Sequence, residues 1–287
     1  MESIQVKAYA KINLGLDVLH KRPDGYHEVR MVMQTIRLFD KLTIKMTHTP
    51  GIAIKTNLSY LPCDENNLIY RAASLFFKAT NEKPGIHVTL DKHIPVAAGL
   101  AGGSSDAAAT LTALNELYHT GFSLAELQEF GVRLGADVPY CLLQGAALSE
   151  GIGELLTPLP APPSAYCLIV KPPISVSTRY VYEHLAIDTA PHPDIDALLS
   201  ALAAGSLPAL AAALGNTLES VTIPLHPEIA KIKQQLVDLG ALGALMSGSG
   251  PTVFALFSDR QTAEHAFYHF KISEYGRQTY LTGFWNR

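Results

Sequence analysis

The sequence has few cysteines and no long apolar run, and each shortage argues against a class of protein. Its three cysteines, Cys63, Cys141 and Cys167, are far apart and form no CxxC pair. This pattern argues against a disulfide framework or a zinc knuckle and favours a reducing compartment. No apolar run approaches the roughly 18 to 20 residues of a membrane span, and the first residues lack a signal-peptide pattern. We therefore expect a cytoplasmic protein with no membrane partner.

Excess positive charge is also missing. The 287 residues carry 26 acidic and 22 basic side chains, for a net charge of −4, and contain no basic run. The general attraction to phosphate backbones that nucleic-acid binding relies on is therefore absent, and we expect no nucleic-acid partner. The composition, with 48% apolar residues, is that of an ordinary globular protein. The length is sufficient for two domains.

The first twenty residues show strand periodicity. Apolar or small residues alternate with polar ones from residue 4 to residue 18. This run is longer than a usual strand, so we expect a break near Ala8 to Ala10. The same alternation places Lys11 and Asn13 together on one face, opposite the apolar row.

Further along the chain, strand and helix patterns are mixed in both halves, without a fixed repeat. We expect strands over 31–46, 85–90, 166–171 and 252–257, and helices over 67–80, 104–118, 123–134 and 227–239, with alanine-rich helical stretches between 195 and 214. This mixture predicts an α+β or α/β protein. A proline-rich stretch at 158–166 predicts a boundary between domains 1–157 and 158–287.

A glycine-rich segment between a strand and a helix is the strongest local signal for chemistry. Such a loop brings backbone N–H donors and the positive end of a helix dipole close to phosphate oxygens. The segment has neither the GK[ST] of a Walker loop nor the glycine spacing of a dinucleotide fold. Its structural alternative is a tight turn. The loop consists of Pro95, Val96, Ala97, Ala98, Gly99, Leu100, Ala101, Gly102, Gly103, Ser104 and Ser105.

Together with two other motifs, this loop resembles the signature of the GHMP kinases, the superfamily of galactokinase, homoserine kinase and mevalonate kinase. The loop matches the ATP-binding motif, residues 10–14 (AKINL) resemble the first motif, and residues 246–252 (MSGSGPT) resemble the third. The resemblance implies that residues 95–105 bind ATP. It also implies a two-domain α+β fold with a cleft, made of an N-terminal domain like ribosomal S5 domain 2 and a C-terminal ferredoxin-like domain.

A second resemblance concerns the substrate. Residues 22–28 (RPDGYHE) are similar to the stretch typical of kinases that act on diphosphocytidyl-methylerythritol, so Tyr26 and His27 are expected to stack on and hydrogen-bond a cytosine. The alternative is a turn with a hairpin aromatic. The same resemblance assigns substrate contacts to Asn13, Thr178 and Tyr182, although Tyr180, two residues before Tyr182, is also available for stacking.

The resemblance implies a catalytic pair. Asp137, in the GADVP segment, corresponds to the residue placed against the acceptor hydroxyl, and Lys11 is the matching lysine. Taken alone, an aspartate just before a proline is an ordinary helix N-cap. The implied reaction transfers the γ-phosphoryl of ATP to the 2-hydroxyl of a cytidine diphosphate-linked methylerythritol, in the non-mevalonate isoprenoid pathway. Mg²⁺ would assist. The metal ligands and the choice between monomer and homodimer stay open, as does whether Lys11 acts on Asp137 or on the phosphate.

Besides nucleic-acid binding through the S5-like fold, which the acidic balance opposes, two rival interpretations remain. A different small alcohol, such as homoserine or mevalonate, could be the acceptor in the same superfamily, and the segment around Tyr26 and His27 argues against it. A nucleotide-binding protein without catalysis would have no need for both Lys11 and Asp137.

Overall fold

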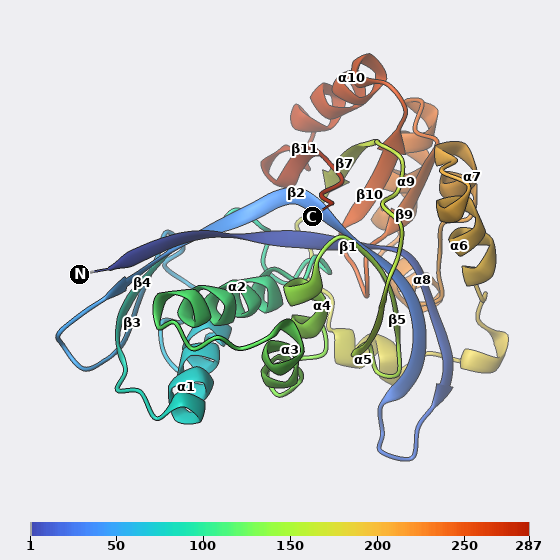
Figure 1. Ribbon diagram of the computed structural model, residues 1–287. Helices are drawn as coiled ribbons and strands as arrows, with labels where there is room; N and C mark the ends of the chain where they lie inside the picture. Colours follow the sequence, from blue (N-terminus) through green and yellow to red (C-terminus); the bar gives the residue numbers. More distant parts are fainter. Residues whose placement is uncertain (1, 287) are drawn as a thin grey trace. The chain divides into compact units, whose positions relative to one another are not determined.

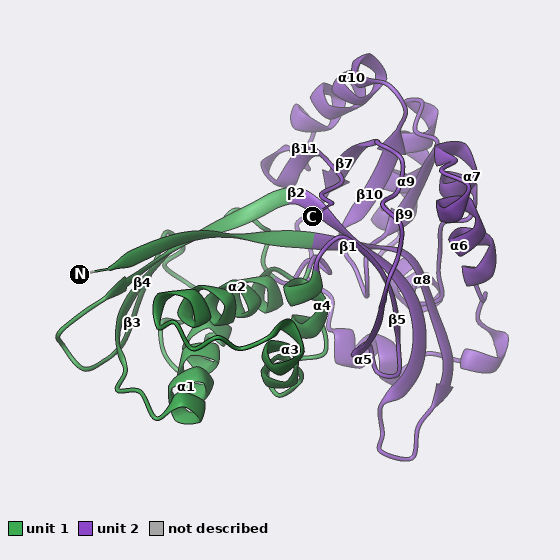
Figure 2. Cartoon of the chain, in the orientation of Figure 1, with its two compact units in different colours: residues 1–10, 38–96, 101–143 green, residues 11–37, 97–100, 144–287 purple. Residues whose placement is uncertain are grey.

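The computed structural model describes residues 2–286, and its chain forms two compact units (Figure 2). Unit 1 comprises residues 1–10, 38–96 and 101–143, and unit 2 comprises residues 11–37, 97–100 and 144–287. Two long neighbouring strands, β1 (Ser3–Lys21) and β2 (His27–Met46), pass through both units. The units are groups of separate stretches that pack together, whereas the predicted domains, 1–157 and 158–287, are continuous stretches of sequence. The division into these two domains therefore stays a prediction.

Unit 1 combines sheet and helices. Its remaining elements are β3 (Gly51–Thr56), α1 (Leu68–Thr80), β4 (Gly85–Asp91), α2 (Gly102–Leu117), α3 (Leu124–Val132) and α4 (Val138–Leu143). Strand β4 pairs antiparallel with residues 41–46 of β2 and parallel with β3. Helix α2 packs against α1 and α4, and α3 packs against α4 (Figure 1).

Local sequence explains the ends of these helices. The side chain of Asn67 accepts a hydrogen bond from the N–H of Ile69 and caps α1. Ser123 and Glu126 form the expected capping box at the start of α3. Both predicted helices are confirmed within two residues of their predicted ends.

Unit 2 holds the rest of the chain. Its remaining elements are β5 (Ala146–Glu150), β6 (Leu155–Pro158), β7 (Tyr166–Val170), α5 (Thr178–Glu183), η1 (Ile187–Thr189), α6 (Ile195–Ala203), α7 (Leu207–Ala212), β8 (Gly215–Asn216), α8 (Glu219–Leu225), α9 (Glu228–Asp238), β9 (Gly243–Met246), β10 (Val253–Phe257), α10 (Arg260–Lys271), η2 (Gly276–Gln278) and β11 (Thr279–Gly283).

Two groups of strands lie in unit 2. Strands β11, β7, β10 and β9 form an antiparallel sheet in that order, and helices α9 and α10 contact it. The second group is built on the long strands: β8 pairs parallel with residues 15–16 of β1, and β5 pairs antiparallel with residues 31–34 of β2 and also with β6. Helices and largely antiparallel strands therefore give an α+β fold, as predicted.

Two local predictions are wrong. Strand β1 continues through Ala8 to Ala10 without a break, because β2 lies beside it in the sheet and nearly every residue from Ala8 to Val18 is buried. Helix α2 begins at Gly102, two residues before the predicted start, and its N-cap Ala101 has no side chain that could accept a capping hydrogen bond. Within residues 2–286, no helix combines the length and the apolar character of a membrane span.

Candidate active site

The glycine-rich loop has a tightly folded backbone. Ala97, Gly99 and Ala101 all take positive φ values, of 51°, 72° and 55°. Alanine rarely adopts this conformation, so the surrounding structure must hold the loop in place. The loop ends at the first turn of α2, where the leading N–H groups of a helix have no intrahelical acceptor. The backbone thus offers the donors that phosphate binding needs.

The three sequence motifs meet within unit 2. The N–H of Lys11, in the first motif, donates to the carbonyl of Leu100 in the loop at 3.1 Å. The hydroxyl of Ser247, in the third motif, donates to the carbonyl of Gly99 at 3.0 Å. A Cβ on Gly99 would lie 2.1 Å from the carbonyl oxygen of Ser247, so this approach requires a glycine. Segments far apart in the sequence therefore form one arrangement.

The third motif is held from two other sides. The side-chain amide of Asn216 donates to the carbonyls of Met246 and Gly248, both at 2.8 Å. The hydroxyls of Ser249 and Thr178 lie 2.7 Å apart. Thr178, a predicted substrate contact, is therefore attached to the third motif. The role of Asn216 was not anticipated, because a lone asparagine gives no local signal for a partner thirty residues away.

Lys11 and Asn13 lie side by side on β1. Both residues are buried, and the ammonium of Lys11 donates to the side-chain oxygen of Asn13 at 2.7 Å. The amide of Asn13 in turn contacts the sulfur of Met31 on β2 at 3.5 Å. The predicted shared face is confirmed, and it places a buried cation next to the segment that contacts the loop.

Within unit 1, the two serines that follow the loop's glycines differ. The hydroxyl of Ser105 is buried and donates to the carbonyl of Tyr9 at 2.6 Å, which ties α2 to β1. Ser104 is partly exposed in the first turn of α2. The hydroxyl of Ser105 therefore holds α2 against β1, whereas the side chain of Ser104 is partly open to solvent.

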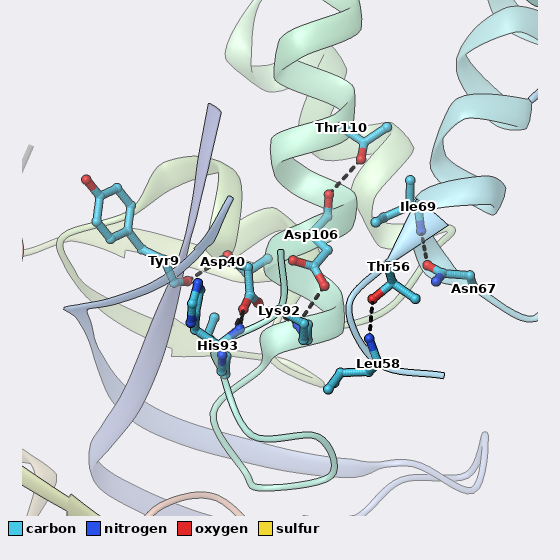
Figure 3. A network of polar contacts seen from close by, with 12 residues as sticks. Tyr9, Asp40, Thr56, Leu58, Asn67, Ile69, Lys92, His93, Asp106 and Thr110 are labelled. Atoms are coloured by element: carbon cyan, nitrogen blue, oxygen red, sulfur yellow. Dashed lines mark hydrogen bonds and ion pairs between the residues drawn. The ribbon is translucent and has the colours of Figure 1, made fainter. Parts of the chain in front are cut away.

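A buried charge cluster, Asp40, Lys92 and Asp106, flanks the loop (Figure 3). The ammonium of Lys92 lies 2.5 Å from a carboxylate oxygen of Asp40 and 2.6 Å from one of Asp106. Burial, together with the nearby Asp40 carboxylate, raises the pKa of Asp106 to about 8, although Lys92 opposes the shift. Sequence reasoning missed this cluster. A signal was present, since Asp40 stands in the buried row of β2 between Leu38 and Leu42.

The segment predicted to recognise cytosine forms an exposed turn in unit 2. Tyr26 is 61% exposed, and its N–H donates to the carboxylate of Asp24. The guanidinium of Arg22 bonds to Asp24 and to Glu28, closing the turn. Acidic partners raise the pKa of Arg22, so this side chain stays charged. The segment is therefore a turn, as in the alternative interpretation, but the ring of Tyr26 is exposed and accessible.

Two aromatic pairs distinguish the candidate stacking residues. The rings of His27 and Tyr182 lie 5.1 Å apart with a 37° tilt. Tyr180 instead stacks on His184, with ring centroids 3.7 Å apart. Burial and the charge of Lys21 lower the pKa of His27, which favours a neutral imidazole at neutral pH. The structure thus pairs the ring of Tyr182 with His27 and the ring of Tyr180 with His184.

Asp137 lies in unit 1, directly before α4, and is partly buried. Its carbonyl accepts the first bond of α4, from the N–H of Cys141 at 3.0 Å. This position agrees with the helix N-terminus that the Asp-Val-Pro sequence predicts. Lys11, the other member of the predicted pair, belongs to unit 2.

Comparisons with known proteins identify the superfamily and the fold. The model of the GHMP kinases N terminal domain matches residues 67–145, which include the loop, and the model of the GHMP kinases C terminal family matches residues 198–274. A crystal structure of homoserine kinase from Cytophaga hutchinsonii has a TM-score of 0.77 at 21% identity, covering 99% of this chain and 94% of the other, which shows a shared fold.

More specific relatives match almost the whole chain. The 4-diphosphocytidyl-2-C-methyl-D-erythritol kinases of Lachnoclostridium phytofermentans and Lachnospira eligens are 60% and 50% identical, covering 99% and 98% of this chain and 98% of each relative. A crystal structure of 4-(cytidine 5'-diphospho)-2C-methyl-D-erythritol kinase has a TM-score of 0.85 at 35% identity, covering 99% of this chain and all of the other. This chain therefore belongs to the 4-diphosphocytidyl-2-C-methyl-D-erythritol kinase family of the GHMP kinases.

Proposed function

We propose that this protein transfers the γ-phosphoryl group of ATP to the 2-hydroxyl of 4-diphosphocytidyl-2-C-methyl-D-erythritol, giving the 2-phosphate and ADP. This reaction is a step of the non-mevalonate route to isoprenoid precursors. The observation that carries the proposal is the meeting of three motifs in unit 2, where Lys11 and Ser247 hydrogen-bond to consecutive carbonyls of the glycine-rich loop. Membership of the kinase family supports the choice of substrate.

In this proposal, residues 95–105 hold the triphosphate. Backbone N–H groups of the loop and of the first turn of α2 would donate to phosphate oxygens, and the helix dipole would add positive potential. Because phosphoryl transfer depends on positioning and charge neutralisation more than on covalent chemistry, a fixed set of donors is the main requirement. The hydrogen bonds that the carbonyl groups of Gly99 and Leu100 accept support this assignment, because they hold the loop backbone in one orientation.

Asp137 and Lys11 are the proposed catalytic residues. The carboxylate of Asp137 would accept or orient the proton of the acceptor hydroxyl. The ammonium of Lys11 would neutralise negative charge that builds on the transferred group. The hydrogen bond from Lys11 to Asn13 keeps the ammonium next to the side-chain amide of Asn13. We propose that Asn13 contacts the polyol or the pyrophosphate of the acceptor.

Tyr26, His27, Thr178 and Tyr182 are the proposed substrate contacts. The exposed ring of Tyr26 can stack on a cytosine, and the neutral imidazole of His27 can accept or donate one hydrogen bond to the base edge. Tyr182, whose ring lies 5.1 Å from that of His27, is the second ring that we expect to stack on the base. Thr178 connects this region to the third motif through Ser249.

Mg²⁺ is the proposed metal cofactor. Among the described residues, no group of three or more His, Cys, Asp or Glu side chains is arranged to hold a metal. Mg²⁺ fits such a protein, because it keeps several waters and binds largely through substrate phosphates. Ser104, partly exposed at the start of α2, is the hydroxyl that we assign to it. The ion would neutralise charge on the phosphates. The use of ATP also agrees with the predicted cytoplasmic location.

The test is an ADP-release assay with Mg-ATP and the cytidine acceptor, run beside homoserine and mevalonate. Of the three acceptors, we expect only the cytidine substrate to be phosphorylated. Asp137→Asn should lower kcat by about 10²–10⁴-fold, whereas Asp238→Asn, at the exposed end of α9, should not change it. Preference for another alcohol would refute the assignment of Tyr26 and His27, and folded protein that binds ATP without turnover would support a binding module.

A further inference from the structure

The buried charge cluster does not belong to the proposed chemistry, and it is unusual in composition. Two carboxyl side chains, Asp40 and Asp106, surround a single ammonium, that of Lys92 (Figure 3). Each of the three side chains is at most 4% exposed. Removing charges from water is costly, and a buried ion pair often contributes no more stability than well-packed apolar residues would. Stability alone therefore does not explain the presence of the cluster.

The cluster joins the two ends of the glycine-rich loop. Lys92 lies three residues before Pro95, and Asp106 directly follows Ser105. The ammonium of Lys92 bonds to the carboxyl groups of both Asp40 and Asp106. The chain that enters the loop and the chain that leaves it are therefore joined by one charged contact. Asp40, the third member of the cluster, lies on strand β2 and also bonds to Lys92.

Backbone contacts strengthen the entry side. One carboxylate oxygen of Asp40 accepts the N–H groups of His93 at 2.5 Å and of Ile94 at 2.8 Å. The side chain of Asn57 pairs with the peptide of Lys92, accepting from its N–H at 2.8 Å and donating to its carbonyl at 3.1 Å. Every residue from 92 to 94 is therefore held by a side chain from another strand or loop.

The exit side packs directly on the ammonium. A Cβ added to Gly102 would lie 2.9 Å from the Nζ atom of Lys92 and 2.9 Å from a methyl group of Ile94. The first turn of α2, whose N–H groups are the proposed phosphate donors, therefore rests on the cluster without space for a side chain at Gly102.

We propose that Asp40, Lys92 and Asp106 are positioning residues that set the geometry of the ATP phosphate-binding loop by holding its two ends together. This inference rests on the proposed role of residues 95–105 in ATP binding. The cluster maintains the entry and exit of the loop, so the strained conformations of Ala97 and Ala101 persist before the nucleotide arrives. Preorganised donors bind the triphosphate without a cost of ordering the loop.

The two carboxylates have different roles in this arrangement. Asp40 uses both oxygens, one for two backbone N–H groups and one for Lys92. Asp106 uses one oxygen for Lys92, and its other side-chain oxygen, Oδ1, has no hydrogen-bond partner among the described residues. An asparagine at position 106 keeps the necessary acceptor. An asparagine at position 40 must direct its NH₂ group either at the ammonium or at the two backbone donors.

The experiment compares Asp40→Asn with Asp106→Asn. For each purified variant we would measure KM for ATP, KM for the acceptor and kcat, and would measure ATP binding separately by calorimetry without acceptor. We expect Asp40→Asn to raise both the Kd and the KM for ATP at least tenfold, with the acceptor KM within twofold of wild type. Asp106→Asn should change the ATP constants by less than threefold.

A matched control separates positioning from general destabilisation. Leu114→Ala removes a fully buried side chain from the same helix α2, away from the loop. It should lower the melting temperature while leaving the KM for ATP unchanged. If Asp40→Asn does not fold, Lys92→Arg replaces it, with the same expected rise in the ATP constants. This variant keeps the charge but adds a larger head group where a Cβ on Gly102 would already lie 2.9 Å from Nζ.

The outcomes distinguish this proposal from the proposed function. Unchanged ATP binding in folded Asp40→Asn or Lys92→Arg would overturn the positioning role, and so would an equal rise in ATP and acceptor KM. If wild-type protein binds ATP but phosphorylates a different alcohol, the proposed acceptor fails. The calorimetric comparison of variants would still test the cluster.

Discussion

The loop that we assign to phosphate and the segment that we assign to cytosine are held in opposite ways. The loop is flanked by the buried charge cluster and bonded through Gly99 and Leu100. The cytosine segment is an exposed turn closed by Arg22, with its main aromatic ring, Tyr26, open to solvent. Phosphate recognition depends on fixed donors, whereas a stacking ring can adjust when the base arrives. Changes in the two regions should therefore affect different kinetic constants.

The largest effect is expected from Gly99→Ala. Its Cβ would lie 2.1 Å from the carbonyl oxygen of Ser247, in a backbone region that side chains disfavour, at a cost of roughly 1–3 kcal/mol or more. We expect lower thermal stability and a KM for ATP raised more than tenfold. Melting curves and ATP titration would check this, and a variant with normal ATP affinity would show that the loop tolerates a shift.

Tyr182→Ala tests the base-recognition side. Loss of the ring beside His27 should raise the acceptor KM by about 5- to 100-fold, since an aromatic stacking contact contributes about 1–3 kcal/mol. The KM for ATP should not change. Tyr180→Ala is the matched control, because Tyr180 stacks on His184 instead. A larger effect at Tyr180 would reverse the assignment.

Ser247→Ala is expected to have a smaller effect on the phosphate side. The substitution removes the hydrogen bond from the Ser247 hydroxyl to the Gly99 carbonyl, which contributes about 0.5–1.5 kcal/mol. We expect the KM for ATP to rise about two- to tenfold, with the acceptor KM nearly constant. Steady-state kinetics with each substrate varied in turn would measure this, and a selective change in acceptor KM would contradict the comparison.

The smallest effect concerns pH and stability. One ring nitrogen of His192 lies 2.6 Å from the Asp17 carboxylate and the other 3.0 Å from the carbonyl of Ile187, so both neighbours are acceptors. They raise the pKa of His192 above 6.5. The protonated ring therefore adds stability below pH 6.5, and this contribution is lost as the pH rises through the raised pKa.

Melting temperatures of wild type and His192→Gln at about pH 6 and about pH 9 would test this linkage. The difference between the two proteins should be larger at the lower pH, and small overall because the His192 side chain is 42% exposed. Equal differences at both pH values would mean that His192 contributes through packing. Thr217, whose hydroxyl also donates to Asp17, is present in both proteins and should not distort the comparison.

Sequence reasoning was most successful where the signal is local. The Ser123 capping box and the shared face of Lys11 and Asn13 both depend on residues within a few positions of one another. It was wrong about the break in β1, because strand length statistics do not include the neighbouring strand β2. It also misplaced the start of α2, since no side chain marks the Ala101 cap.

By itself, the sequence determined the order and spacing of the three motifs, and therefore the kinase family. Only the tertiary structure decided which side chains support them. Lys92 meets Asp40 and Asp106 across separations of 52 and 14 residues, and Asn216 reaches Gly248 across 32. Such pairings depend on how strands and helices pack, because a buried charge or amide must find its partner in space and no local pattern specifies which residue that will be.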